Sequence, residues 1–140
     1  MEFGELVKLF LLDLQYLFRD RVVTSGMTLT QILLLSSIPD EGIDMTALTR
    51  RMGVDNSTLT RLVDVLIRRG WIKKNKNPED GRSIIVSFTP DGDEIQRQIE
   101  EKIDQFGESL YREIPFESRD EVKEVLSSFH WMITKSKLKQ

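Results

Sequence analysis

A cluster of hydrogen-bonding side chains between residues 56 and 61 is the part of this sequence best equipped for chemistry. The cluster combines an amide, three hydroxyls and a guanidinium: Asn56, Ser57, Thr58, Thr60 and Arg61. Asparagine and arginine can make paired hydrogen bonds to the edges of adenine and guanine in the DNA major groove, and a helix N-terminus favours phosphate. The cluster therefore favours recognition of DNA. The alternative is that these side chains form only the solvated face of an amphipathic helix.

The sequence is poorly supplied with the groups that catalysis and metal binding need. Its 140 residues contain no cysteine and a single histidine, His130. The lack of cysteine excludes disulfides, thiolate ligands, cysteine nucleophiles and thiol-based redox sensing, and one histidine does not support a zinc or iron site built from imidazoles. No nucleophile stands at a suitable spacing from a base. We therefore expect no enzyme activity, no metal and no cofactor, and a structural or solvated His130.

Charge is unevenly distributed along the chain. The 20 basic and 23 acidic residues give a net charge of −3, which taken whole argues against a polyanionic partner. Residues 50–82, however, contain nine basic and four acidic residues and carry +5, whereas the rest carries −8. A polyanion responds to charge within about 8–10 Å, so the local excess matters more than the total. From this segment we expect further DNA contacts at Arg68, Lys74 and Lys76, against the alternative of an ordinary solvated face.

Length and composition indicate one globular domain, or one lobe with an arm. Hydrophobic residues make up 39% of the chain and charged residues 31%, which is too apolar for a disordered chain. The longest unbroken apolar runs are four residues, so we expect no membrane span. Glu2 and Glu5 stand where a secretory signal would carry positive charge, which favours a cytoplasmic protein.

The cluster at 56–61 opens the second of two short predicted helices. Asp44 and Asp55 each stand at an N-cap between apolar staple residues, and Gly53 separates the two helices. Glycine permits the sharp change of backbone direction that helices so close in sequence require. This spacing is typical of a helix-turn-helix. In the second helix one face is a continuous apolar stripe: Leu59, Leu62, Val63, Leu66 and Ile67.

A β-hairpin is predicted after Gly70, which ends the second helix. Residues 71–76 and 82–88 form its two strands, and apolar residues alternate along the return strand. A hairpin directly after a recognition helix is a wing, and Arg82 at its edge could enter a narrow minor groove. The alternative is a surface hairpin in which Asp80 and Arg82 only pair with each other.

Two helices are predicted before this helix-turn-helix. Residues 3–18 are apolar on nearly every face, which is more than one small core can bury, so this helix requires a second partner. Residues 19–26 form a connector. Thr28 and Gln31 then form a capping box that opens a helix running to Ile38.

Two more helices are predicted after the wing. Thr89 caps a long helix whose apolar residues form a narrow seam. Pro115 interrupts the helical pattern, and Ser118 with Glu121 forms another capping box at the start of the last helix. The basic residues at the end of that helix, Lys135, Lys137 and Lys139, are expected to be solvated.

With these elements in this order, the chain resembles the MarR family of winged-helix transcription regulators. The resemblance is densest from Met27 to Gly92. Its strongest marks lie in the second helix, the start of the hairpin, the wing tip and the strand-to-helix joint: residues 57–64, 69–72, 77–82 and 88–92. One departure is Thr49, which stands where the family usually has alanine.

The resemblance implies a homodimer in which the helices of residues 3–18, 90–112 and 118–136 interlock. It also implies that the 56–61 cluster faces bases and phosphates, with Arg82 at the wing tip and Asp80 orienting it or bracing it against the helix. A small aromatic or anionic effector is a further implication. The candidate residues for its pocket are Phe10, Leu14, Tyr16 and Trp71.

We therefore expect a mainly α (α+β) protein in three parts. Residues 1–26 provide an N-terminal dimerisation helix and connector, 27–92 a winged helix-turn-helix DNA-binding lobe, and 93–140 C-terminal dimerisation helices. The predicted function is sequence-specific regulation of transcription by a homodimer bound to a pseudo-palindromic site in double-stranded DNA, as a repressor that an effector relieves. The alternative is a winged-helix protein-interaction module without DNA binding, against which Arg61, Arg82 and the basic segment argue.

Overall fold

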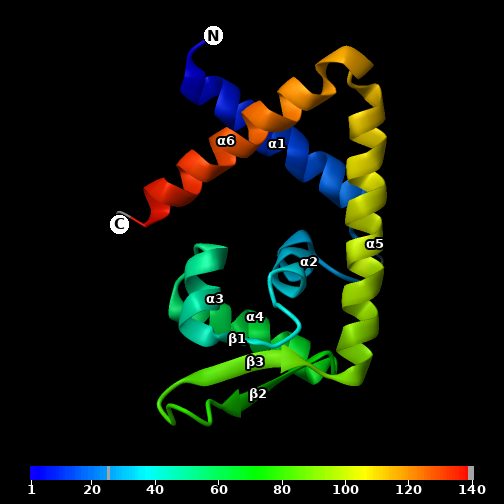
Figure 1. The fold of residues 1–140 in the computed structure, drawn as a ribbon. Helices are drawn as coiled ribbons and strands as arrows, with labels where there is room; N and C mark the ends of the chain where they lie inside the picture. Colours follow the sequence, from blue (N-terminus) through cyan, green and yellow to red (C-terminus); the bar gives the residue numbers. More distant parts are fainter. Residues whose placement is uncertain (25, 139–140) are drawn as a thin grey trace. The chain divides into compact units, whose positions relative to one another are not determined.

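Among residues 1–24 and 26–138, which the computed structural model describes, the chain forms six α-helices and a three-stranded antiparallel sheet (Figure 1). It divides into two units, Met1–Ile103 and Asp104–Gln140, and helix α5 (Pro90–Glu113) contributes residues to both. The expectation of a mainly helical protein with a small β-hairpin is confirmed.

The predicted helix-turn-helix is present as α3 (Met45–Met52) and α4 (Asn56–Arg68). Asp44 caps α3, because its Oδ1 accepts hydrogen bonds from the backbone N–H groups of Thr46 at 2.7 Å and Ala47 at 3.3 Å. Asp55 caps α4 by accepting from the N–H of Thr58 at 2.7 Å. Gly53 turns the chain between the helices with φ +69°, a conformation that costs glycine little.

The sheet contains a strand that the sequence pattern did not indicate. Strand β1 (Ile43–Asp44) pairs with β3 (Ile84–Phe88), which also pairs with β2 (Ile72–Lys76), in the order β1-β3-β2. Residues 40–43 read as a turn because a two-residue strand is too short to show alternation. The strand explains why Ile85, on an otherwise polar face of β3, is apolar: it pairs with Asp44 and packs over Gly42.

The core of the first unit lies beneath α2 (Leu29–Ser36), α3, α4 and the sheet. Thr28 and Gln31 form the predicted capping box of α2, which ends two residues earlier than predicted. The side chains that are almost fully buried are aliphatic: Val22, Ile32, Leu34, Leu35, Ile38, Leu48, Leu59, Val63, Leu66, Ile72, Val86 and Ile99. Leu62 and Ile67, at the edges of the α4 stripe, are half-buried. This packing leaves the opposite face of α4 to solvent.

The joint between the sheet and α5 is held at Thr89. Its backbone N–H donates to the carbonyl of Trp71 at 3.1 Å, and its hydroxyl accepts from the N–H of Gly92 at 3.0 Å. The predicted N-cap is therefore confirmed. One turn further along α5, the buried side chain of Gln96 donates to the carbonyl of Ile38 at 3.0 Å and holds the end of α2.

Helix α1 (Phe3–Arg21) continues three residues beyond its predicted end and so takes the start of the expected connector. Most of its large apolar side chains are exposed: Phe3, Leu6, Val7, Phe10, Leu11, Leu12, Leu14 and Tyr16. Contiguous exposed apolar surface of this kind is rare on a soluble monomer.

In the second unit, a single turn of 3-10 helix (Phe116–Ser118) precedes α6 (Arg119–Lys137). The predicted capping box of Ser118 and Glu121 is wrong. Pro115 starts the 3-10 turn, so Ser118 already has near-helical dihedral angles (φ −104°, ψ −6°) and its side chain makes no capping hydrogen bond. The apolar side of α6 is exposed over most of its length: Val122, Val125, Leu126, Met132 and Ile133. His130 and Lys135 are also exposed, and Lys139 lies outside the described residues.

Within the described part of the chain, none of the helices combines the length and the apolar character needed to cross a bilayer. No group of three histidine or carboxylate side chains in that same part is placed to hold a metal ion.

Candidate DNA-binding interface

The 56–61 cluster lies on the solvent side of α4. Asn56, Ser57, Thr60 and Arg61 are exposed, and Thr58 is half-buried. Hydrogen bonds within the helix fix the orientation of the shorter side chains, since Ser57 donates to Asp55 Oδ1 at 3.0 Å and Thr60 donates to the Asn56 carbonyl at 2.8 Å. Arg61 makes a long hydrogen bond of 3.4 Å to Thr58 Oγ1. Because this contact is weak, the guanidinium is available to a ligand. The first turns of α4 thus present several polar groups on one accessible face.

Both capping aspartates of the helix-turn-helix are held in the ionised form. The Thr58 backbone N–H, followed by the Thr58 and Ser57 hydroxyls, lowers the pKa of Asp55 below its ordinary value of 3.8. For Asp44, the Ser83 hydroxyl makes the largest contribution to lowering the pKa, the backbone N–H groups of α3 add to it, and partial burial opposes them. These carboxylates therefore stabilise the two helix starts best when they are charged.

Acid is expected to weaken the helix-turn-helix through these caps. A pKa that is lower in the folded than in the unfolded chain stabilises the fold above the unfolded value, about 3.9 for aspartate, and that stabilisation is lost as the pH falls through the folded value. The thermal unfolding midpoint of Asp44→Asn should therefore lie below that of the wild type at pH 7, with a difference that shrinks below about pH 4. A difference independent of pH would contradict this role of the carboxylate.

The hairpin contacts α4 through an ion pair. Lys74 Nζ on β2 lies 3.2 Å from Asp64 Oδ1 on α4, and the Lys74 side chain is 30% exposed. Of the three cations expected from the basic segment, Arg68 and Lys76 are exposed, whereas Lys74 already has an acidic partner. The pair attaches the hairpin to the helix and lowers the positive charge available at this point.

A hollow of about 250 Å³ separates the start of α3, the start of α4 and the hairpin. Its lining is formed by Met45, Thr46, Thr49, Asn56, Thr60, Lys74 and Ile84. The structure thus brings together three predicted site residues with two threonines that the sequence analysis did not assign to the site. Thr49, the departure from the family pattern, donates to the Met45 carbonyl of its own helix at 2.8 Å and so needs no partner on α4. Thr46 lies two residues after Asp44, the N-cap of α3. This position near a helix start was the only sign in the sequence that Thr46 lies close to the site.

At the wing tip, Asp80 orients the neighbouring arginine. Asp80 Oδ1 accepts from the Arg82 backbone N–H at 3.1 Å and lies 3.8 Å from Arg82 Nε. The pairing considered as an alternative is therefore present, yet the Arg82 side chain remains 97% exposed. The contact engages the backbone N–H and the Nε edge of the guanidinium, and the rest of the Arg82 side chain stays in solvent.

The residues expected to line an effector pocket do not line the pocket between α3, α4 and the hairpin. Phe10, Leu14 and Tyr16 are 56%, 40% and 70% exposed on α1. Trp71 is half-buried, with the guanidinium of Arg69 4.9 Å above its ring. Arg69 also donates to the Gly26 carbonyl, so this stacked pair joins the end of α4 to the segment that precedes α2.

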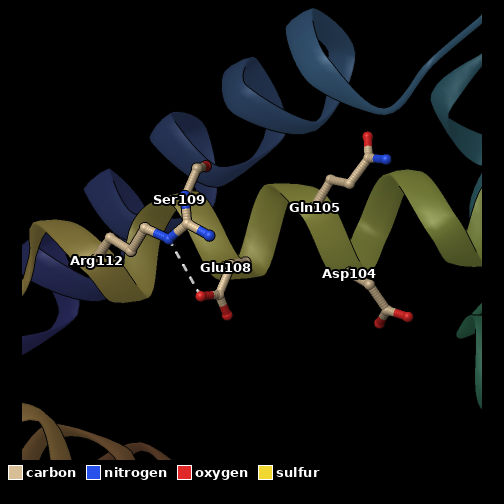
Figure 2. Close-up of a pocket in the computed structure, with 5 residues that line it drawn as sticks. All are labelled: Asp104, Gln105, Glu108, Ser109 and Arg112. Carbon is tan, nitrogen blue, oxygen red and sulfur yellow. Dashed lines mark hydrogen bonds and ion pairs between the residues drawn. The ribbon is translucent and has the colours of Figure 1, made fainter.

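A second hollow lies along α5 in the other unit (Figure 2). One helix supplies its whole lining: Asp104, Gln105, Glu108, Ser109 and Arg112. Arg112 Nε pairs with Glu108 Oε1 at 3.2 Å, and Ser109 donates to the Phe106 carbonyl at 2.7 Å. Figure 2 shows Gln105 and Ser109 on one side of the helix and Asp104 and Glu108 on the other, so these side chains do not converge on one point. This pocket contains two carboxylates and one paired arginine, so it is poorly suited to a polyanion. The exposed amide, hydroxyl and cationic groups of α4 and the hairpin suit a polyanion better.

Comparison with known proteins shows which family the chain resembles. A model of the MarR family matches residues 27–84, the helix-turn-helix and most of the hairpin. Over these residues the chain is similar to the MarR family. The multiple antibiotic resistance protein MarR of Salmonella typhimurium is 37% identical over 89 residues, which cover 63% of this chain and 60% of that protein. The chain therefore spans about 60% of the length of that relative.

More distant matches cover more of the chain. The transcriptional regulator SarZ of Staphylococcus epidermidis is 23% identical over 120 residues, which cover 85% of this chain and 78% of SarZ. Among solved structures, a crystal structure of MarR matches with a TM-score of 0.81 at 20% identity, over 100% of this chain and 96% of that one. A mutant MarR from Escherichia coli complexed with operator DNA matches with a TM-score of 0.73 at 23% identity, over 90% of this chain and 91% of that one.

These comparisons confirm the winged helix-turn-helix fold. The curated relatives named above are a multiple antibiotic resistance protein and an HTH-type transcriptional regulator.

Proposed function

We propose that this chain is a member of the MarR family and a sequence-specific double-stranded DNA-binding regulator of transcription that acts as a homodimer. The observation that carries the proposal is the exposed 56–61 cluster on a helix whose opposite face is buried in the core. In this proposal α4 enters the major groove, where Asn56 and Arg61 contact bases and the hydroxyls contact phosphates. Arg82 follows the adjoining backbone or minor groove. Arg68, Lys74 and Lys76 add attraction to phosphates, and Asp80 orients Arg82.

A second copy of the chain is the proposed partner of the terminal helices. The exposed apolar surface of α1 supports this, and so, independently, does that of α6. Two-fold symmetry would present two copies of α4 to DNA, with half-sites about one helical turn (~34–36 Å) apart. We further propose the division into residues 1–26, 27–92 and 93–140, in which the middle part binds DNA and the outer parts dimerise.

Repression is the proposed outcome, because a dimer on promoter DNA blocks access to it. A small aromatic or anionic effector at Phe10, Leu14, Tyr16 and Trp71 would relieve repression by changing the spacing of the two recognition helices. Such an effector acts only in proportion to its differential affinity for the two spacings.

An electrophoretic shift on random-sequence duplex DNA at low salt tests the proposal directly. We expect binding of the wild-type chain with a dissociation constant below about 10 μM, since the basic segment attracts any duplex. The control is Arg97→Ala, which removes an exposed cation of α5 that pairs with Glu94 and Glu101, away from the candidate interface. Absence of binding would favour the protein-interaction module instead.

Removing the acidic partner of Lys74 is expected to strengthen attraction to DNA. Asp64→Asn deletes a negative charge from α4 and frees Lys74 for phosphate. We expect tighter binding to random duplex and a salt dependence steeper by about one unit per subunit. The matched variant Glu100→Gln removes an exposed carboxylate from α5. An equal gain from both variants would show that only net charge matters, and would contradict the placement of Lys74 at the interface.

A further inference from the structure

Ser83 closes the tip of the wing. Its carbonyl accepts from the N–H of Asn77 at 2.9 Å, and its own N–H donates to the carbonyl of Asp80 at 3.0 Å. The tip loop of residues 77–83 is therefore tied together at Ser83, directly beside Arg82. Any displacement of Ser83 would move the tip and the arginine with it.

The Ser83 side chain leaves the hairpin and reaches the helix-turn-helix. Its hydroxyl donates to Oδ2 of Asp44, while Oδ1 of the same carboxylate accepts from the first N–H groups of α3. The Asp44 backbone also pairs with Ile85 across β1 and β3. One carboxylate thus contacts the start of α3 through one oxygen and the tip of the wing through the other.

This contact is the attachment nearest the tip. The ion pair between the hairpin and α4, Lys74 with Asp64, lies in the middle of β2, and β1 reaches only as far as Ile85 on β3. A two-stranded ribbon beyond its last attachment is free to twist and bend. Holding Ser83 in place before DNA arrives reduces the conformational entropy that binding would otherwise cost.

We infer that Asp44 and Ser83 are positioning residues, which fix the wing tip relative to the helix-turn-helix so that Arg82 is presented at a set distance from α4. The inference rests on the proposed function and goes beyond it. Neither residue touches DNA in this account, because both act through Arg82.

The test combines Ser83→Ala with Arg82→Ala on duplex DNA selected by the wild-type chain. Ser83→Ala should weaken binding about fivefold to tenfold, since a hydrogen bond to a charged group is lost. In the Arg82→Ala background the same substitution should change affinity less than about twofold, because the side chain that it positions is gone. Ser83→Thr retains the hydroxyl and should bind like the wild type.

Hydrogen exchange separates positioning from folding. In the free Ser83→Ala protein, the amides of Asn77 and Ser83 should exchange faster while those of α4 stay closer to wild-type rates. The thermal unfolding midpoint should fall less than in Asp44→Asn, because Oδ1 of Asp44 still caps α3. Ser87→Ala, on the same face of β3, is the matched control and should change neither exchange at the tip nor affinity.

The outcomes distinguish the inference from the proposed function. If the wild-type chain selected no DNA, the proposed function would fail and this inference with it. If the wild type bound but Ser83→Ala bound equally well, or lost affinity to the same extent with and without Arg82, the inference alone would be overturned.

Discussion

Replacing Arg61 by alanine is expected to weaken binding to a selected operator by about 100-fold, since a paired contact between arginine and a base is worth about 1–3 kcal/mol and both subunits lose it. Arg61 carries the one guanidinium of the exposed cluster on α4, and its closest polar neighbour, Thr58 Oγ1, is 3.4 Å away. Its removal therefore leaves the helix caps and the core intact. Affinity for random duplex should fall much less, because phosphate attraction depends on all nearby cations.

Quantitative shift assays on selected and random duplexes measure this difference. Asn56→Ala should behave like Arg61→Ala, with a large loss of sequence preference. Arg82→Ala should weaken binding with a smaller loss of preference, because a wing contact reads shape and backbone more than base edges. Equal losses on both duplexes from all three variants would contradict the division between base contacts on α4 and positioning contacts on the wing.

The second large effect is expected on folding, from Gly92→Ala at the start of α5. A Cβ on Gly92 would lie 1.7 Å from the Trp71 carbonyl oxygen, 2.7 Å from its carbon and 3.1 Å from Cδ1 of Phe88. The Trp71 carbonyl cannot easily move away, because it accepts from the Thr89 N–H. Overpacking against backbone should cost about 3 kcal/mol or more of the free energy of unfolding, which exceeds the gain of about 1 kcal/mol in helix propensity.

Chemical denaturation of the purified variant measures this loss. Gly81→Ala at the wing tip is the control, since a Cβ there would meet nothing within 4 Å. Its unfolding midpoint should stay near that of the wild type. A Gly92→Ala protein as stable as Gly81→Ala would contradict the close packing of α5 on the strand-to-helix joint.

Sequence reasoning succeeded where structure is set by neighbouring residues. The caps at Asp44, Asp55 and Thr28 were predictable because each needs only a short polar side chain two or three residues before its hydrogen-bond partner. The exposure of the 56–61 cluster followed from the apolar stripe on the other side of the same helix. These local patterns sufficed to predict the helix-turn-helix and its polar face.

The errors and omissions came from contacts between distant segments. Strand β1 pairs with a strand more than forty residues later, so nothing within residues 40–44 indicated it. Lys74 appeared as a free cation in the sequence, whereas the fold places Asp64 beside it. At Ser118 the local capping pattern was outweighed by Pro115, which starts a 3-10 turn that runs directly into α6.

In the wing, too, local structure was predictable and a contact between distant residues was not. Its strands and tip were predictable from turn residues and alternation, and Asp80 was expected to orient Arg82. The contact from Ser83 to Asp44 was not predictable, because the two residues are 39 positions apart and each has an ordinary local role. A serine in a strand and an aspartate at an N-cap carry no sign of their mutual contact.

In vitro selection of bound duplexes by the wild-type chain, followed by sequencing, tests the central claim most directly. The claim is that two copies of α4, held by a paired scaffold, insert into successive major grooves on one side of the duplex. The predicted result is enrichment of an inverted repeat whose half-site centres lie about 10 base pairs apart. Enrichment of an isolated half-site, or of no sequence at all, would contradict it.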